Sequence, residues 1–157
     1  MTFVPLTIGQ LAPDFTLPCD GGTTVTLSTL QPFAVVLFFY GQDGTPSCTN
    51  EVMEFNALLP RFTAAGVTVI GISKDKVTAH DKFKARMGIG FALGSDHGGQ
   101  MMQAWSAFGD KIFFGKPVVG VLRSTVLIDR AAKIVQVWKV DKVKGHAAQV
   151  LAAAQAL

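Results

Sequence analysis

The residues with the clearest chemical potential lie in one stretch, Thr45–Glu51 (TPSCTNE), a few residues after the apolar run Ala34–Tyr40. Cys48 is one of two cysteines in the chain. The first turn of a helix favours a thiolate, because its free N–H groups and its dipole attract negative charge. Thr45 can hydrogen bond near the sulfur, and Pro46 fixes the backbone between them. From this placement alone, a nucleophilic thiolate and a buried cysteine that only fills space are about equally supported.

The composition is that of one globular domain spanning residues 1–157, with 49% hydrophobic and 16% charged residues. The net charge of +3 is small and the lysines are scattered, which argues against a nucleic-acid partner. The longest apolar run, Phe33–Tyr40, is too short to span a bilayer, so no membrane association is expected. The N-terminus MTFVPLTIGQ has no charged region before an apolar one, and two cysteines cannot form a disulfide framework. We therefore expect a cytoplasmic protein.

The elements that must position Cys48 are readable from hydrophobic periodicity. Phe15–Leu17 and Thr23–Leu27 alternate around the turn CDGG as a β-hairpin would, and 34–40 is continuous like a strand buried on both faces. Helical spacing begins at Cys48; Pro60 should kink or end this helix, and Gly66 should stop it. The remaining expected elements are a strand at 67–73, helices at 77–87 and 99–108, strands at 124–128 and 134–138, and a helix at 145–157.

This order of elements predicts an α/β thioredoxin-like fold, with a central mixed β-sheet flanked by helices and an N-terminal β-hairpin extension. In open α/β sheets the active crevice lies beyond the carboxyl ends of the strands. Cys48 follows such an end.

The stretch TPSCTNE, with VVLFFY before it, resembles the active-site segment of the peroxiredoxins, whose pattern is P-x-x-x-T-x-x-C. The segments VTVIGISKD, SDHGGQMMQAWSAFG, GKPVVGVLRSTVLID and VKGHAAQVL are similar to the peroxiredoxin Q branch, also called bacterioferritin comigratory protein. The resemblance runs from about Gly9 to the C-terminus.

The resemblance implies a hydroperoxide reductase. Cys48 would be the peroxidatic cysteine, which attacks hydrogen peroxide or an organic hydroperoxide and becomes a sulfenic acid. Thr45 would bind the peroxide, Arg123 would stabilise the thiolate and the transition state, and Glu51 would orient the arginine. For Glu51, an ordinary first-turn glutamate favoured by the helix dipole is an equal alternative. No metal and no organic cofactor are implied, and the reductant would be an external thiol: thioredoxin, glutaredoxin or a small thiol.

Two positions depart from the family pattern. Gly41 stands where the family has the proline that shields the thiolate, so we expect a freer loop and a slower or more easily overoxidised enzyme. Met53 stands where many members carry a resolving cysteine, and the helix expected at 77–87 contains no cysteine. Only Cys19 could resolve Cys48, if the two Cα atoms came within about 7 Å. We favour Cys19 as an exposed, unpartnered turn residue and hence a one-cysteine mechanism.

Other candidate residues have simpler explanations. His80, His97 and His146 show no metal-ligand spacing and are expected at the surface. Gly88, Gly90 and Gly94 lack the strand–loop–helix order of a nucleotide site. Four aromatic residues either line the active-site pocket and accept alkyl hydroperoxides, or simply pack in the core: Trp105, Phe108, Phe113 and Phe114.

Two rival functions remain at this point. A thioredoxin-type oxidoreductase is disfavoured because the chain lacks C-x-x-C. A redox sensor or a thioredoxin-like binding protein with weak peroxidase activity would use the same fold to bind partners. The expected state is a monomer or a weak homodimer.

Overall fold

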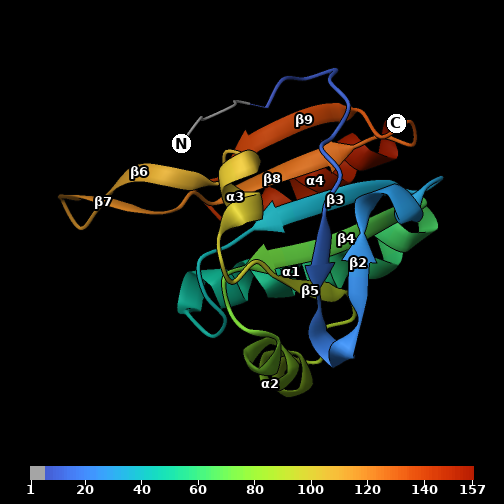
Figure 1. Ribbon diagram of the computed structural model, residues 1–157. Helices are drawn as coiled ribbons and strands as arrows, with labels where there is room; N and C mark the ends of the chain where they lie inside the picture. The colour runs from blue at the N-terminus through green and yellow to red at the C-terminus, as the bar shows by residue number, and fades with distance from the viewer. Residues whose placement is uncertain (1–5) are drawn as a thin grey trace.

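A computed structural model describes residues 6–157 of the chain (Figure 1). The first part of the N-terminal stretch used above to judge a secretory signal, residues 1–5, lies outside the described residues. Within the described part, no helix is long and apolar enough to cross a membrane.

A five-stranded mixed sheet with the order β5-β4-β3-β8-β9 forms the centre of the molecule. Strands β3, β4 and β5 run parallel, whereas β8 is antiparallel to β3 and β9 is antiparallel to β8. The sheet strands are β3 (Ala34–Phe39), β4 (Val67–Ser73), β5 (Ala92–Ser95), β8 (Ser124–Ile128) and β9 (Ile134–Lys139). Two hairpins lie outside this sheet, β1 (Thr16–Pro18) with β2 (Thr24–Thr26), and β6 (Phe108–Phe113) with β7 (Lys116–Val121).

Helices cover both faces of the sheet. α1 (Pro46–Ala64) and α4 (His146–Gln155) pack together on one face, and α3 (Gln100–Ala104) lies with the β1–β2 hairpin on the other (Figure 1). α2 (Val77–Met87) packs beside β5 and the short 3-10 helix η1 (Asp20–Gly22). A second 3-10 helix, η2 (Leu27–Leu30), follows β2. The expected thioredoxin-like architecture with an N-terminal hairpin is therefore confirmed.

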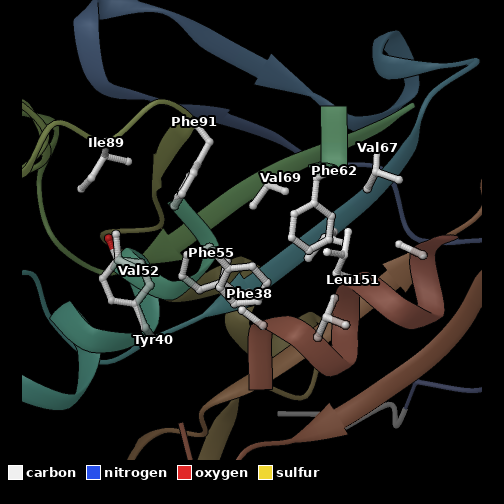
Figure 2. Close-up of a cluster of buried hydrophobic side chains, with 14 of the residues drawn as sticks. Phe38, Tyr40, Val52, Phe55, Phe62, Val67, Val69, Ile89, Phe91 and Leu151 are labelled. Atoms are coloured by element: carbon white, nitrogen blue, oxygen red, sulfur yellow. The ribbon is translucent and has the colours of Figure 1, made fainter. Parts of the chain in front are cut away.

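The central strand β3 is buried on both faces, as its continuous apolar sequence predicted. Val36 and Phe38 face α1 and α4, whereas Leu37 and Phe39 face the β1–β2 hairpin and α3. The rings of Phe38 and Phe55 stack with centroids 4.4 Å apart, which joins β3 to α1 (Figure 2). This packing fixes where the chain leaves β3 and enters α1, and Cys48 lies at that point.

The helix expected from Cys48 begins at Pro46 and continues through Pro60 to Ala64, so Pro60 does not end it. Pro60 is exposed, so its ring lies on the solvent side of the helix. Phe62, two residues later, is fully buried and holds the last turn against the core. Gly66 follows in the left-handed conformation and leads into β4.

The segment between β5 and β8 differs most from the expectation. The helix expected at 99–108 is only five residues long, and the chain then forms the β6–β7 hairpin, which projects from the body as an arm (Figure 1). Ile112, Phe113, Phe114 and Val119 are exposed on this arm. Because its apolar side chains are not buried against the sheet, the arm lacks the alternating pattern that identifies a half-buried strand.

Candidate active site

The candidate site forms where β3 ends. Tyr40 continues the pairing with β4 through its N–H, which donates to the Ile72 carbonyl at 3.0 Å. The chain then forms a loop, which we call the 41–45 loop after its residues, and enters α1 at Pro46. Thr45 is the N-cap of α1 and has an extended backbone. Its hydroxyl donates to the carbonyl of Gln42 at 3.0 Å, which closes the loop on itself.

Cys48 occupies the first turn of α1 and is only 4% exposed. Arg123 comes from the segment between β7 and β8, 75 residues away, and its Nη2 lies 3.2 Å from Cys48 Sγ. The same guanidinium donates to the Ser47 hydroxyl at 3.0 Å and to Glu51 Oε1 at 2.9 Å. Arg123 is held in turn because its carbonyl accepts the N–H of Val140 at 3.0 Å. The structure therefore brings together Thr45, Cys48, Glu51 and Arg123, as the sequence analysis expected.

The surroundings of Cys48 favour its ionised form. Burial by itself would raise the pKa of the Cys48 thiol, but several groups oppose this and hold the pKa below its ordinary value. These groups are the Thr45 side chain, the backbone at Gln42, the Arg123 charge and the backbone at Gly41. In the structure the Thr45 hydroxyl donates to Gln42, so it must rotate to donate to a thiolate at Cys48.

Glu51 is 1% exposed and forms an ion pair with Arg123 at 2.9 Å. Burial raises its pKa to about 7, although the Arg123 charge opposes the shift. Oε1 carries the bond to Arg123, and Oε2 has no hydrogen-bond partner among residues 6–157. Arg123 therefore contacts the Cys48 sulfur and Glu51 at the same time.

A hollow of about 480 Å³ opens beside the site, and its lining includes Gly41 and Arg123. Ile112 and Phe113 of the β6–β7 arm also line it, together with Lys111, Lys139 and their neighbours. Of the four aromatic residues considered from the sequence, only Phe113 lines this hollow. Trp105 is buried in the core near Phe39 and Phe15, Phe108 is half-buried beneath Lys74, and Phe114 is 89% exposed.

The expectation that Cys19 is exposed is wrong, because this residue is fully buried. It forms a backbone bridge to Gly94 of β5, and Cys19 Sγ contacts the Leu17 carbonyl at 3.7 Å. Burial, aided by the charge of Asp20, raises the pKa of the Cys19 thiol. The turn residues CDGG suggested exposure, but the hairpin packs against β5 and buries Cys19 and Asp20, whereas Gly21 and Gly22 remain exposed.

Two of the three histidines expected at the surface are also buried. His80 is fully buried and His146 is 5% exposed, whereas His97 is exposed. His146 Nε2 lies 2.7 Å from the Thr125 hydroxyl. His80 lies with Asp43 and Asp75 in a group whose ligand atoms are within 4.8 Å of one another. The charged and glycine neighbours of these histidines suggested solvent, but their partners lie far away in the sequence.

The group of Asp43, Asp75 and His80 could hold a cation by proximity alone, but its atoms are already engaged with one another. Both ring nitrogens of His80 meet acceptors, Asp43 Oδ2 at 2.6 Å and the Gly94 carbonyl at 3.0 Å. A ring with both nitrogens occupied has no lone pair for a metal. Asp43 and Ser47 were not identified from the sequence, and their position on either side of Thr45 and Pro46 is the one signal that could have marked them.

Comparison with known proteins places this arrangement in a family. Residues 8–137 match the AhpC/TSA family. The peroxiredoxin Bcp of Xanthomonas campestris is 41% identical over 156 residues, which cover 99% of this chain and 98% of the relative. The peroxiredoxin Bcp of Bacillus subtilis is 38% identical over 144 residues, which cover 92% of each chain.

Solved structures agree in fold. The bacterioferritin comigratory protein of Xanthomonas campestris, studied for its alkyl peroxide reduction activity in trapped intermediate and ligand complexes, superposes with a TM-score of 0.85 at 42% identity over 90% of each chain. A mutant of PrxQ from Xylella fastidiosa superposes with a TM-score of 0.90 at 37% identity over 96% of each chain. The chain therefore belongs to the AhpC/TSA family and is a peroxiredoxin of the Bcp and peroxiredoxin Q type.

Proposed function

We propose that Cys48 is the peroxidatic cysteine of this thiol-dependent peroxidase, with Thr45 and Arg123 as its anion site and Glu51 and Pro46 in support. The observation that carries the proposal is the 3.2 Å contact between Arg123 Nη2 and Cys48 Sγ at the first turn of α1. A fixed cation and free helix N–H groups both stabilise the thiolate, which is the nucleophilic form of cysteine. Pro46 at the start of the helix removes a competing N–H and fixes the entry of the chain.

The reaction begins when the thiolate attacks the terminal oxygen of a hydroperoxide. The S–O bond forms as the O–O bond breaks, the sulfur is oxidised to a sulfenic acid, and the peroxide is reduced to water or an alcohol after protonation of the departing oxygen. Negative charge develops on that oxygen, and Arg123 and the Thr45 hydroxyl lie where they can stabilise it. The hollow lined by Gly41 and Arg123 lies next to this anion site, and we expect a hydroperoxide to approach the sulfur from it.

A one-cysteine cycle completes the proposal, and the sheet geometry supports it. Cys19 bridges Gly94, Gly94 lies opposite Ile72, and Ile72 lies opposite Phe39 near the end of β3. Neighbouring strands are about 4.8 Å apart, so about 14 Å separates Cys19 from the end of β3, beyond which Cys48 lies. A disulfide requires Cα atoms within about 7 Å. Resolution by Cys19 would therefore need the N-terminal hairpin to leave the sheet.

An external thiol then reduces the sulfenic acid. Its sulfur attacks the Cys48 sulfur, water leaves, and a second thiol breaks the mixed disulfide. Thioredoxin, glutaredoxin and small thiols are the reductants that we propose, in the cytoplasm, where such thiols are kept reduced. We propose a monomer or a weak homodimer, which sedimentation at several concentrations will distinguish.

The test is intact mass after one equivalent of H2O2 with dimedone present, for the wild type, Cys48→Ser and Cys19→Ala. We expect a dimedone adduct in the wild type and in Cys19→Ala, and none in Cys48→Ser. Loss of two hydrogens in the wild type, with an adduct only in Cys19→Ala, would overturn the one-cysteine cycle. If Cys48 reacts in neither the wild type nor Cys19→Ala, the peroxidatic role is overturned and the redox-sensor alternative is favoured.

A further inference from the structure

A buried polar network lies beneath the 41–45 loop, and the reaction described above does not use it. Its centre is His80 of α2, which is fully buried. The Nδ1 of His80 lies 2.6 Å from Asp43 Oδ2, and Nε2 lies 3.0 Å from the carbonyl of Gly94. A carbonyl only accepts hydrogen bonds, and so does an ionised carboxylate. Both ring nitrogens must therefore carry hydrogen, so His80 is an imidazolium in this arrangement.

Asp43 is held at three points. Its Oδ2 accepts from His80, its Oδ1 accepts from the Tyr40 hydroxyl at 2.6 Å, and its N–H donates to Asp75 Oδ2 at 2.9 Å. Asp75 is fixed in turn, because the Ser73 hydroxyl donates to the same oxygen at 2.6 Å. The attachments come from the ends of β3 and β4 and from α2, so Asp43 joins three elements to the middle of the loop.

The two residues before Asp43 act on Cys48. Gln42 supplies backbone that favours the thiolate, and its carbonyl holds the Thr45 hydroxyl at 3.0 Å. Gly41 also supplies backbone that favours the thiolate. A loop that is exposed at Gly41, Gln42 and Gly44 has little other packing to keep these groups in place.

We propose that His80 is a positioning residue for the peroxidase reaction, whose protonated ring holds Asp43 and thereby holds the 41–45 loop in the arrangement that stabilises the Cys48 thiolate. The inference rests on the proposed role of Cys48. It adds a residue of α2 to the machinery, although His80 does not touch the sulfur or the peroxide.

The network also gives the proposal a pH dependence. Burial lowers the pKa of His80, but the Asp43 carboxylate, the Gly94 carbonyl and the Asp75 charge together raise it above its ordinary value. The charged groups that face His80 are thus Asp43 of the loop and Asp75 after β4. Above the raised pKa the ring loses one N–H, and either the Asp43 bond or the Gly94 bond is broken. Loosening of the loop should therefore begin at a pH above the ordinary histidine pKa.

The test measures the pKa of Cys48 through the pH dependence of its alkylation by iodoacetamide, with the Cys48 peptide read by mass. His80→Phe removes both donors, His80→Gln keeps one side-chain amide donor, and His97→Gln makes the same change at an exposed histidine as the matched control. We expect His80→Phe to raise the pKa of Cys48 by about one pH unit and to lower kcat/KM for H2O2 about tenfold. His80→Gln should lie between it and the wild type, and His97→Gln should match the wild type.

Asp43→Asn completes the test through a double-mutant cycle. If His80 acts through Asp43, the double variant His80→Phe/Asp43→Asn should be no worse than the worse single variant. If His80→Phe does not fold, His80→Gln and Tyr40→Phe carry the test, because each weakens the hold on Asp43 with a smaller change in volume. A folded His80→Phe or His80→Gln with an unchanged pKa of Cys48 would overturn the proposal.

The outcome is separable from that of the proposed function. If the wild type consumes peroxide through Cys48 but the His80 variants leave both readouts unchanged, only the positioning role fails. If the wild type fails to consume peroxide but the His80 variants still raise the pKa of Cys48, the positioning role stands and the peroxidase reaction fails.

Discussion

Arg123 contacts Cys48 Sγ through Nη2 at 3.2 Å and holds Glu51 through Nη1 at 2.9 Å, so a single side chain links the reactive sulfur to a buried carboxylate. The guanidinium fork makes this possible, because its donors point in fixed directions. Arg123 therefore joins Cys48 and Glu51, which lie one turn apart in α1.

Removal of this fork should be the most damaging change outside Cys48 itself. Arg123→Gln should raise the pKa of Cys48 and lower kcat/KM for H2O2 roughly a hundredfold, since transition-state charge loses its fixed partner. Arg123→Lys keeps the charge but not the fork, and we expect an intermediate loss. Stopped-flow measurement of peroxide consumption gives kcat/KM for both variants.

Arg130→Gln is the matched control, because the Arg130 guanidinium donates to the Ala65 carbonyl near the far end of α1. This variant should retain wild-type rates. A wild-type rate for Arg123→Gln would remove Arg123 from the anion site.

The buried Glu51 should make stability fall as pH rises. Its folded-state pKa is about 7, against about 4.3 in an unfolded chain. Between these values the folded state binds more protons than the unfolded state, so the free energy of unfolding decreases with rising pH. The whole decrease should be about 4 kcal/mol and complete near pH 8, and Glu51→Gln should lack it.

Urea unfolding of the wild type and Glu51→Gln at pH 5 and pH 8 measures the difference. The Cys48 thiol is present in both proteins, so its own titration largely cancels in the comparison. Parallel pH profiles of the two proteins would contradict the buried, raised-pKa state of Glu51.

Local sequence patterns were sufficient to predict the strand and the helix that hold the site. The apolar run 34–40, the break after it and the helical spacing from Cys48 all depend on neighbouring residues. The partner of Cys48 could not be found in this way, since Arg123 lies 75 residues away and only the family resemblance indicated it. Long-range packing decides such contacts, and one sequence does not contain that information in its spacing.

The same dependence on long-range packing explains why His80 and Cys19 were wrongly expected at the surface. His80 meets Asp43 across 37 residues, and Cys19 is covered by β5, which begins at Ala92 and was not predicted. The β6–β7 arm was missed for another reason. Its apolar residues are exposed, so an apolar sequence in this segment does not indicate a buried strand.

Gly41 should shield the Cys48 sulfur only weakly, but its backbone N–H should be an extra hydrogen-bond donor to the thiolate. A Cβ at this position would lie 3.6 Å from Cys48 Sγ, an ordinary contact distance. Gly41→Ala should therefore cover the sulfur and slow overoxidation to the sulfinic acid about twofold to fivefold, a change within the effect of one added methyl group. The mass increase of Cys48 under excess peroxide measures it.

Gly41→Pro tests the donor separately, because proline has no N–H. It should cover the sulfur as alanine does but should raise the pKa of Cys48, since the backbone of Gly41 helps to lower it. Equal thiol pKa values in the two variants would show that the Gly41 N–H does not act on the thiolate.

Phe113 should influence the choice of peroxide, because it lines the hollow beside Gly41 and Arg123 whereas its neighbour Phe114 does not. An apolar wall stabilises the alkyl group of an organic hydroperoxide and offers nothing to H2O2. Phe113→Ser should lower kcat/KM for cumene hydroperoxide about fivefold to tenfold relative to H2O2. Phe114→Ser is the matched control, since this residue is 89% exposed, and the ratio of the two substrates should stay at the wild-type value. If both variants reduce both substrates equally well, the β6–β7 arm takes no part in substrate selection, and the preference must lie nearer to the sulfur.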